Sequence, residues 1–148
     1  MEFLFPIPET AHPLLSRPGQ DASAPAWKVE RGVVKGFVDL LFEDEGKVFV
    51  CDWKSDALPS FGADGMARHC QQNYDVQARI YTLAALRMCQ IRDADDYARR
   101  FGGVLFCFLR GRRIDDDRIG IHIDEPSWDD LLAWESDMLG PTFWGIAR

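Results

Sequence analysis

The chain has 148 residues, of which 47% are apolar, so it is long enough for one domain with its own hydrophobic core, and disordered or fibrous architecture is excluded. Acidic residues outnumber basic ones by 24 to 17, and the net charge of -7 argues, taken alone, against a nucleic-acid partner. The basic residues comprise 13 Arg and only 4 Lys, so a Lys in a special position is of particular interest.

Residues 2–7 alternate weakly between apolar and polar side chains and run into prolines, which predicts one short strand. A long Pro-rich loop is expected from residue 8 to about residue 28. Residues 33–42 and 47–54 are rich in β-forming side chains and are separated by the polar sequence 43–46. These two runs predict a β-hairpin.

Residues from about 71 to 90 carry apolar side chains at helical spacing without Gly or Pro, which predicts one helix of about five turns. The same kinds of signal predict a helical turn at 95–100, a buried strand at 104–109 opened by Gly102-Gly103, a polar turn at 110–117, a last strand at 119–123, and a final helix that starts at Ser127 and Asp130 and runs through Met138. The order of elements predicts an α/β fold with a mixed central sheet flanked by helices.

The four cysteines stand singly, without the short spacings typical of a metal site: Cys51, Cys70, Cys89 and Cys107. Their apolar surroundings favour reduced, buried thiols. The N-terminus does not resemble a signal peptide, and no stretch approaches the ~20 apolar residues of a membrane span. We therefore expect a cytoplasmic protein without a membrane partner.

Two carboxylates and an ammonium group are predicted to share one face of the hairpin. If the loop is the two-residue Glu45-Gly46, Asp39 falls opposite Asp52, although a one-residue bulge would turn Asp39 to the other face. Lys54 projects from the same face as Asp52, because strand side chains alternate, and Trp53 points the opposite way.

Facing carboxylates on an apolar strand pair repel each other and require compensation. A divalent cation supplies it, because Mg²⁺ and Mn²⁺ take one or two carboxylates together with water and phosphate oxygens. The simpler interpretation is a salt-bridge cluster of Asp39, Asp52 and Lys54 on a solvated sheet face. The pattern alone leaves both interpretations open.

The predicted helix brings Gln77 and Tyr81 to one face, with Tyr74 one turn earlier on the same side. Their amide and hydroxyl groups would reach a phosphate or Lys54. The alternative is that the tyrosines are core aromatics and that Gln77 has no special role. His12, His69 and His122 are given no role, because a lone His is more often a surface or hydrogen-bonded residue than a ligand.

The residues Gly36-Phe37-Val38-Asp39, Asp52-Trp53-Lys54 and Tyr74 to Tyr81 follow the order G-x-x-D, D-x-K and Y-x-x-Q-x-x-x-Y. This pattern resembles the PD-(D/E)XK nuclease superfamily. More narrowly, it is similar to the C-terminal nuclease domain of the RecB subunit of the bacterial RecBCD helicase-nuclease. The sequence 101–111 and the opening Met1-Glu2-Phe3 are also similar to that family, so the likeness spans nearly the whole of residues 1–148.

The resemblance implies a restriction-endonuclease-like core that hydrolyses DNA phosphodiester bonds with Mg²⁺, for which Mn²⁺ would substitute. It implies that Asp39, Asp52 and the backbone carbonyl of Trp53 bind the metal, that Lys54 is the catalytic lysine, and that Gln77 and Tyr81 orient the lysine or the DNA. It also implies a role in double-strand-break processing and recombination repair, with helicase domains or subunits of a RecBCD-like complex as partners.

Relatives of this kind carry, upstream of the first strand, a helical segment with a metal-binding His that has no counterpart in residues 1–148. We therefore expect either a fragment of a larger protein or a stand-alone homologue. A catalytically silent protein-interaction module, with aromatics at 141–144 as its contact surface, is the alternative function. A phosphatase or nucleotide hydrolase is disfavoured because no Gly-rich phosphate loop is present. DNA binding by this domain is expected to be weak and salt-sensitive, because basic clusters are few.

Overall fold

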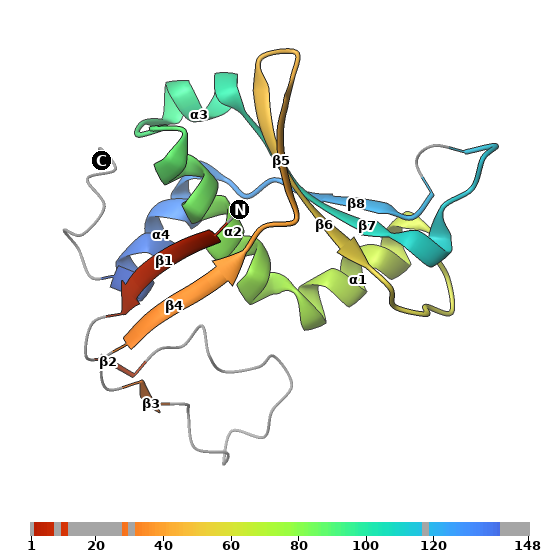
Figure 1. Cartoon of the computed structure of the whole chain (residues 1–148), viewed down its shortest axis with the longest axis horizontal. Coiled ribbons are helices and arrows are strands. Elements are labelled where there is room, and N and C mark those ends of the chain that lie inside the picture. The colour runs from red at the N-terminus through yellow and green to blue at the C-terminus, as the bar shows by residue number, and fades with distance from the viewer. Residues whose placement is uncertain (1, 8–9, 12–27, 30–31, 117–118, 140–148) are drawn as a thin grey trace.

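The computed structural model describes residues 2–7, 10–11, 28–29, 32–116 and 119–139 (Figure 1). The strands are β1 (Glu2–Ile7), β2 (Thr10–Ala11), β3 (Lys28–Val29), β4 (Gly32–Phe37), β5 (Leu40–Asp44), β6 (Lys47–Lys54), β7 (Phe101–Phe108) and β8 (Ile121–Asp124). The helices are α1 (Ala63–Asn73), α2 (Asp75–Met88), α3 (Ala94–Arg100) and α4 (Trp128–Leu139), with a 3-10 helix, η2 (Leu109–Gly111).

The described strands form a four-stranded sheet in the order β5-β6-β7-β8, and two separate pairs, β1 with β4 and β2 with β3. Strands β6 and β7 are parallel, whereas β5 and β6, and β7 and β8, are antiparallel. A parallel pair requires a long crossover, and α1, α2 and α3 lie between β6 and β7 in the chain. The predicted mixed sheet flanked by helices is therefore confirmed.

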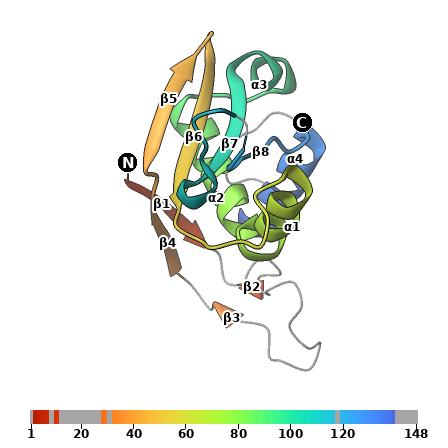
Figure 2. The ribbon, with the colours of Figure 1, turned by 90° about the vertical axis from the view of Figure 1, so that its right-hand side faces the viewer.

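The helices define an inner face of the sheet. Helix α2 contacts β6 and β7, α1 contacts β8, and α4 packs against α2 and β1. In Figure 2 the hairpin of β5 and β6 lies away from α1 and α4. Val50 and Phe106 are completely buried on the inner face, whereas Trp53 and Ile123, on the opposite face, are 48% and 51% exposed. The polar groups of the site therefore depend on which face each strand residue occupies.

The hairpin has the predicted two-residue loop. Asp44 pairs with Lys47, and Glu45 and Gly46 form the turn with φ angles of 48° and 79°. Two consecutive positive φ angles are typical of the tight turns whose twist matches the flanking strands. The register therefore runs as expected, as far as the pair Leu40 and Cys51.

The predicted continuous strand at 33–42 is wrong in one respect, because it is broken at Val38 and Asp39. The first part, β4, pairs with β1, and the second, β5, pairs with β6. Val38 is 2% exposed and belongs to the core, and a carboxylate oxygen of Asp39 accepts the N–H of Trp53 at 3.0 Å. A side chain therefore takes the place of a strand ladder bond at the point where the chain changes partner.

The single helix predicted at 71–90 is also wrong, because two helices meet at Tyr74. Tyr74 has φ -126° and ψ 2°, which ends α1 and starts α2. The first helix escapes the sequence pattern because Gly65 lies in its first turn and only Met66 and Cys70 are buried along it. Helix α2 ends at Met88, two residues before the predicted end.

The strand predicted at 104–109 begins earlier, at Phe101, so that Gly102 and Gly103 lie inside β7 and do not precede it. Gly103 has φ +119°, and a Cβ atom there would come within 3.0 Å of the backbone oxygen of Asp124. Glycine thus allows β8 to approach β7 closely. The strand predicted at 119–123 is confirmed with shifted bounds.

Two predictions for the C-terminal part of the chain are confirmed, namely the helical turn at 95–100 and the final helix. The helical turn at 95–100 is α3, and the hydroxyl oxygen of Ser127 accepts the N–H of Asp130 at 3.2 Å at the start of α4. Leu131 is completely buried, as the apolar stripe of this helix requires. Most of the predicted loop at 8–28, and the aromatics at 141–144, lie outside the described residues. None of the described helices is long and apolar enough to span a membrane.

All four cysteines are free thiols, and Cys51, Cys70 and Cys107 are buried, while Cys89 is half-buried. Burial raises the pKa of Cys51 and of Cys70 to about 12. Both thiols are therefore protonated at neutral pH and unreactive as nucleophiles. The interpretation of the cysteines as core residues is confirmed.

Candidate active site

The C-terminal end of β6 carries two charged residues into the protein interior. Asp52 is 5% exposed and Lys54 is 9% exposed, whereas Trp53 between them is 48% exposed. The alternation of side chains along a strand produces this arrangement, as predicted. Buried charges are costly unless they are paired, so the partners of Asp52 and Lys54 define the site.

The ammonium group of Lys54 is held by three groups. Its Nζ atom lies 2.6 Å from Oδ2 of Asp52 and donates to Oε1 of Gln77 at 2.7 Å. It also lies 3.7 Å from the centroid of the Tyr74 ring, within the range of a cation–π interaction. The positive charge of Lys54 is therefore paired, and its side chain is fixed in direction.

Gln77 and Tyr81, one turn apart on α2, complete the network, as their spacing predicted. The Nε2 atom of Gln77 donates to Oδ1 of Asp52 at 3.1 Å and to the hydroxyl oxygen of Tyr81 at 2.7 Å. The Tyr81 hydroxyl donates to the backbone oxygen of Phe37 at 2.7 Å and lies 3.2 Å from Oδ1 of Asp52. Helix α2 is thereby tied both to β6 and to the end of β4.

The hydroxyl of Tyr81 remains a donor at neutral pH. Burial raises the pKa of Tyr81 to about 12, and the negative charges of Asp52 and Asp39 act in the same direction, against the hydrogen bond from Gln77. Asp39 therefore lies close enough to Tyr81 to influence it electrostatically.

Asp39 lies at the break between β4 and β5, where its side chain is exposed. Its Oδ2 atom accepts the N–H of Trp53 at 3.0 Å. The Asp39 carboxylate is therefore directed toward the end of β6, at the residue that follows Asp52. The strand pairing stops one residue earlier, at Leu40 and Cys51. The direct cross-strand pairing of Asp39 with Asp52 is thus replaced by a side-chain contact to the neighbouring backbone.

The donor set fits a hard divalent cation that keeps most of its water. Within the described residues, no group of three or more His, Cys, Asp and Glu side chains gathers to hold a metal. Mg²⁺ is commonly held by one or two carboxylates, with water and phosphate oxygens as the other ligands. Asp39 and Asp52, with the backbone carbonyl of Trp53, offer oxygen ligands of this kind.

A second cluster, formed by Asp56, His69 and Tyr74, was missed by the sequence reasoning. The Tyr74 hydroxyl donates to Oδ2 of Asp56 at 2.8 Å, and Nε2 of His69 lies 3.3 Å from Oδ1 of Asp56. Tyr74 therefore presents its ring to Lys54, while its hydroxyl group points to Asp56 and not to the lysine. The only sequence signal was the spacing of Asp52, Lys54 and Asp56 at alternate positions.

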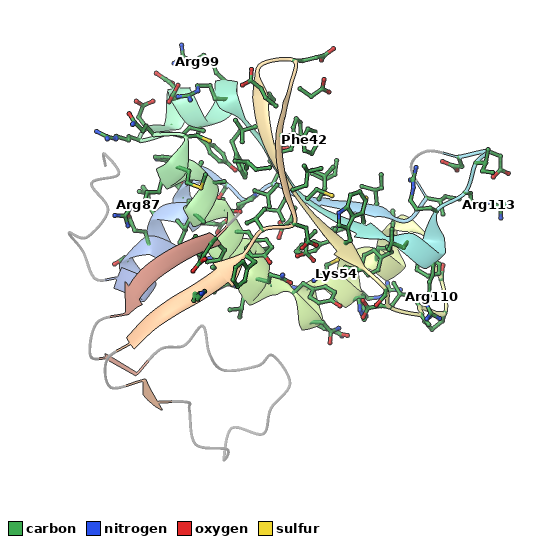
Figure 3. The ribbon with its side chains drawn as sticks, viewed as in Figure 1. Phe42, Lys54, Arg87, Arg99, Arg110 and Arg113 are labelled. Atoms are coloured by element: carbon green, nitrogen blue, oxygen red, sulfur yellow. The ribbon has the colours of Figure 1, made fainter. Side chains whose placement is uncertain are left out.

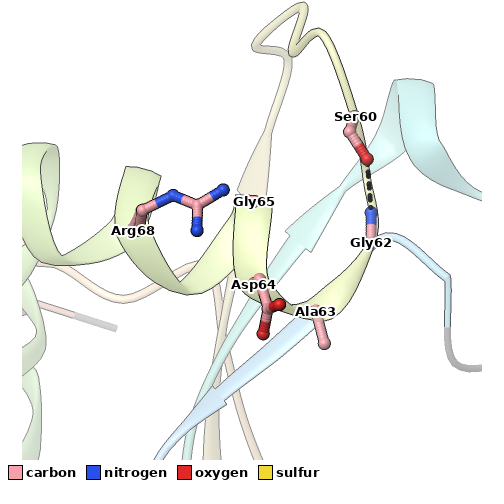
Figure 4. A pocket seen from close by; sticks show the side chains of 6 residues that line it. All are labelled: Ser60, Gly62, Ala63, Asp64, Gly65 and Arg68. Atoms are coloured by element: carbon pink, nitrogen blue, oxygen red, sulfur yellow. Dashed lines mark hydrogen bonds between the residues drawn. The ribbon is translucent and has the colours of Figure 1, made fainter.

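A surface hollow of about 320 Å³ lies at the start of α1 (Figure 4). Its lining residues are Ser60, Gly62, Ala63, Asp64, Gly65 and Arg68. The hydroxyl oxygen of Ser60 accepts the N–H of Gly62 at 3.2 Å there. None of the predicted site residues lines this hollow, so the candidate active site lies elsewhere, at the junction of β6 and α2.

The chain thus combines a mixed sheet with an acidic residue before one strand, an Asp-x-Lys sequence at the end of the next strand, and a Gln on the crossover segment. The PD-(D/E)XK nuclease superfamily matches residues 11–140, and the chain belongs to this superfamily.

Within the superfamily, the chain is similar to the RecBCD enzyme subunit RecB of several bacteria. It is 40% identical to RecB of Escherichia coli (strain K12) over 103 residues, which are 66% of this chain and 9% of RecB. It is 40% identical to RecB of Haemophilus influenzae over 103 residues, 66% of this chain and 8% of that protein. It is 25% identical to RecB of Borreliella burgdorferi over 115 residues, 70% of this chain and 10% of that protein. The matched part thus spans about a tenth of the length of these relatives, and the predicted resemblance is confirmed.

Proposed function

We propose that this chain is a metal-dependent deoxyribonuclease domain that hydrolyses phosphodiester bonds of DNA. The observation that supports it most is the buried Lys54, whose ammonium is fixed between Asp52 and Gln77. Such a preorganised charge at the surface end of a strand is suited to stabilising a transition state that gains negative charge. The membership of the PD-(D/E)XK nuclease superfamily supports the same reaction.

Asp39, Asp52 and the backbone carbonyl of Trp53 would hold Mg²⁺, and Mn²⁺ would substitute for it. A cation bound there supplies a Lewis acid that lowers the pKa of water and offsets the charge of the phosphate. Asp39 is exposed, so a phosphate and water can approach it. The charge of Asp52 is already balanced by Lys54 at 2.6 Å, which lowers the cost of its burial before a metal binds.

Lys54 would orient the attacking water or stabilise the negative charge that develops on the scissile phosphate. An ammonium group has three N–H donors, and Asp52 and Gln77 accept two of them. Gln77 and Tyr81 would hold Asp52 and Lys54 in this geometry, because both bond directly to the Asp52 carboxylate.

Incubation of the protein with linear single-stranded and double-stranded DNA tests the proposal directly. With Mg²⁺ or Mn²⁺ present, we expect cleavage that EDTA abolishes. Asp52→Asn and Lys54→Ala should each slow cleavage by about 100-fold or more, because each removes a charge from the transition-state environment. Asp44→Asn and Lys47→Ala, in the hairpin turn, are the matched controls and should cleave like the wild type. Equal cleavage by the Asp52 and Lys54 variants would contradict the proposal.

Calorimetry separates metal binding from catalysis. Titration with Mn²⁺ should give binding that is lost in both Asp39→Asn and Asp52→Asn, whereas Asp44→Asn should bind like the wild type. Binding that survives both substitutions would exclude the proposed ligands.

The relatives named RecBCD enzyme subunit RecB suggest the larger context. The domain would act with helicase domains or subunits of a RecBCD-like complex in double-strand-break processing and recombination repair. Co-purification of the domain with helicase subunits from the source cell tests this context.

A further inference from the structure

We propose that Tyr74 is a positioning residue. Asp56 and His69 hold the ring of Tyr74 in place, and the face of this ring fixes the catalytic ammonium of Lys54. This inference rests on the proposed function, because it assigns to Tyr74 a task in the reaction of Lys54. It concerns a side of the lysine that neither Asp52 nor Gln77 supports.

The ring of Tyr74 is fixed on several sides. It stacks on Phe106, with centroids 5.4 Å apart and an interplanar angle of 22°. The ring of His69 meets the Tyr74 ring edge-on, with centroids 5.6 Å apart and an interplanar angle of 71°. The Tyr74 hydroxyl donates to Oδ2 of Asp56 at 2.8 Å. Tilting the ring would therefore break a hydrogen bond and disturb two aromatic contacts.

The ring in turn constrains Lys54. The Nζ atom lies 3.7 Å from the Tyr74 centroid and 5.3 Å from that of Phe106. The lysine side chain is 10% exposed, so little water competes with the ring for the ammonium. A Lys side chain has four rotatable bonds, and two hydrogen-bond acceptors alone leave it freedom to swing between them. The aromatic face removes that freedom by defining the third side of the ammonium site.

The support behind Tyr74 is itself ordered. Nδ2 of Asn73 donates to the backbone oxygen of His69 at 2.9 Å and lies 3.3 Å from Nδ1 of that ring. Donation by this amide to Nδ1 assigns the ring proton to Nε2, which then donates to Asp56. Burial acts to raise the pKa of Asp56, but the hydrogen bonds from Tyr74 and His69 outweigh it and lower the pKa. Asp56 therefore stays ionised as the acceptor for both residues.

A ring-current measurement tests the geometry without depending on cleavage. The chain has only four lysines, so selective ¹³C labelling resolves the side-chain CH₂ signals of each. We expect the signals of Lys54 nearest Nζ to shift upfield relative to those of Lys47. Lys35, whose Nζ lies 5.2 Å from the Phe37 centroid, should show a smaller shift. Tyr74→Leu should reduce the Lys54 shift to about that of Lys35, because Phe106 remains 5.3 Å from Nζ, and Tyr74→Phe, which keeps the ring, should keep most of the shift.

Kinetics test the positioning role. Asp56→Ala and Tyr74→Phe should each lower kcat by about tenfold with little change in KM, because they loosen the support of Lys54 and leave Asp39, Asp52 and Lys54 in place. Tyr97→Phe is the matched control, since it removes the hydroxyl of another buried tyrosine, which lies on α3 and donates to the Pro126 backbone oxygen at 2.6 Å. It should leave both kcat and the Lys54 shift unchanged.

The two proposals fail in different ways. An unshifted Lys54 signal in the folded wild type, or a shift that Tyr74→Leu does not reduce, overturns the positioning role whatever the nuclease assay gives. Wild-type kcat in both Asp56→Ala and Tyr74→Phe overturns it as well, and these mild variants avoid the core defect that Tyr74→Leu introduces. A shifted Lys54 in a protein that cleaves no DNA instead overturns the proposed nuclease function.

Discussion

Tyr81 joins three parts of the fold through a single hydroxyl group. This hydroxyl receives the Gln77 amide at 2.7 Å and donates to the Phe37 backbone oxygen at 2.7 Å. It therefore links α2 to the end of β4 while it also borders Asp52. Tyr81, which the sequence pattern alone allows as a core aromatic, thus uses its hydroxyl group to link elements within the site.

Tyr81→Phe should destabilise the protein, because it leaves the part-buried backbone carbonyl of Phe37 and one N–H of Gln77 without their Tyr81 partner. The expected loss is about 1–3 kcal/mol in the free energy of unfolding, measured by urea titration. Tyr97→Phe is a suitable comparison, since its hydroxyl donates to one acceptor, the Pro126 oxygen. An equal or smaller loss in Tyr81→Phe than in Tyr97→Phe would show that its hydroxyl does not connect these segments.

Contacts that follow from the periodicity of one element could be predicted from the sequence, and contacts that depend on the path of a connecting segment could not. Asp52 and Lys54 follow from alternation along a strand, and Gln77 and Tyr81 from one turn of a helix. Asp56 follows the end of β6, and His69 lies on α1, so no periodicity fixes their distance. Their contact with Tyr74 depends on the path of the chain between β6 and α1, which only the structure gives.

At the scale of elements, the two wrong predictions have the same physical cause. The strand at 33–42 and the helix at 71–90 are continuous in propensity, but each is interrupted in the structure where a side chain of the site requires a new direction. Asp39 lies in one interruption and Tyr74 lies in the other. Local preference is a weak constraint, and tertiary contacts to β6 decide where these elements end.

The hairpin turn holds one residue in an unfavourable backbone conformation. Glu45 adopts φ 48°, in the left-handed region that costs most residues about 1–2 kcal/mol. Asn tolerates this region, and Asn-Gly is the preferred pair for such turns. Glu45→Asn should therefore raise the free energy of unfolding by about 1 kcal/mol in urea titrations. Glu43→Asn, within β5, is the control and should lower it, because Asn is unfavourable in strands. Unchanged stability in Glu45→Asn would mean that the turn imposes no strain.

At the scale of the whole molecule, several of the described basic side chains pair with acidic ones. Lys35 pairs with Glu2 at 2.7 Å, and Arg113 pairs with Asp115 at 3.0 Å. Figure 3 shows Arg110 and Arg113 at one end of the molecule and Arg87 and Arg99 at the other, so these four side chains do not form one cluster. Arg31, another basic residue of the chain, lies outside the described residues.

The net charge of -7 and these ion pairs together predict that the isolated domain binds DNA weakly. Affinity from phosphate contacts falls steeply with salt, with a slope set by the number of phosphates neutralised. Filter-binding titrations with EDTA present, to prevent cleavage, should detect a complex at low salt and lose it near physiological salt. Asp115→Asn, which releases Arg113 from its partner, should strengthen the low-salt complex. A tight complex that persists in high salt would contradict this prediction, because it would require a binding surface that these charges do not provide. Weak binding would mean that the active site depends on additional contacts to hold its DNA substrate.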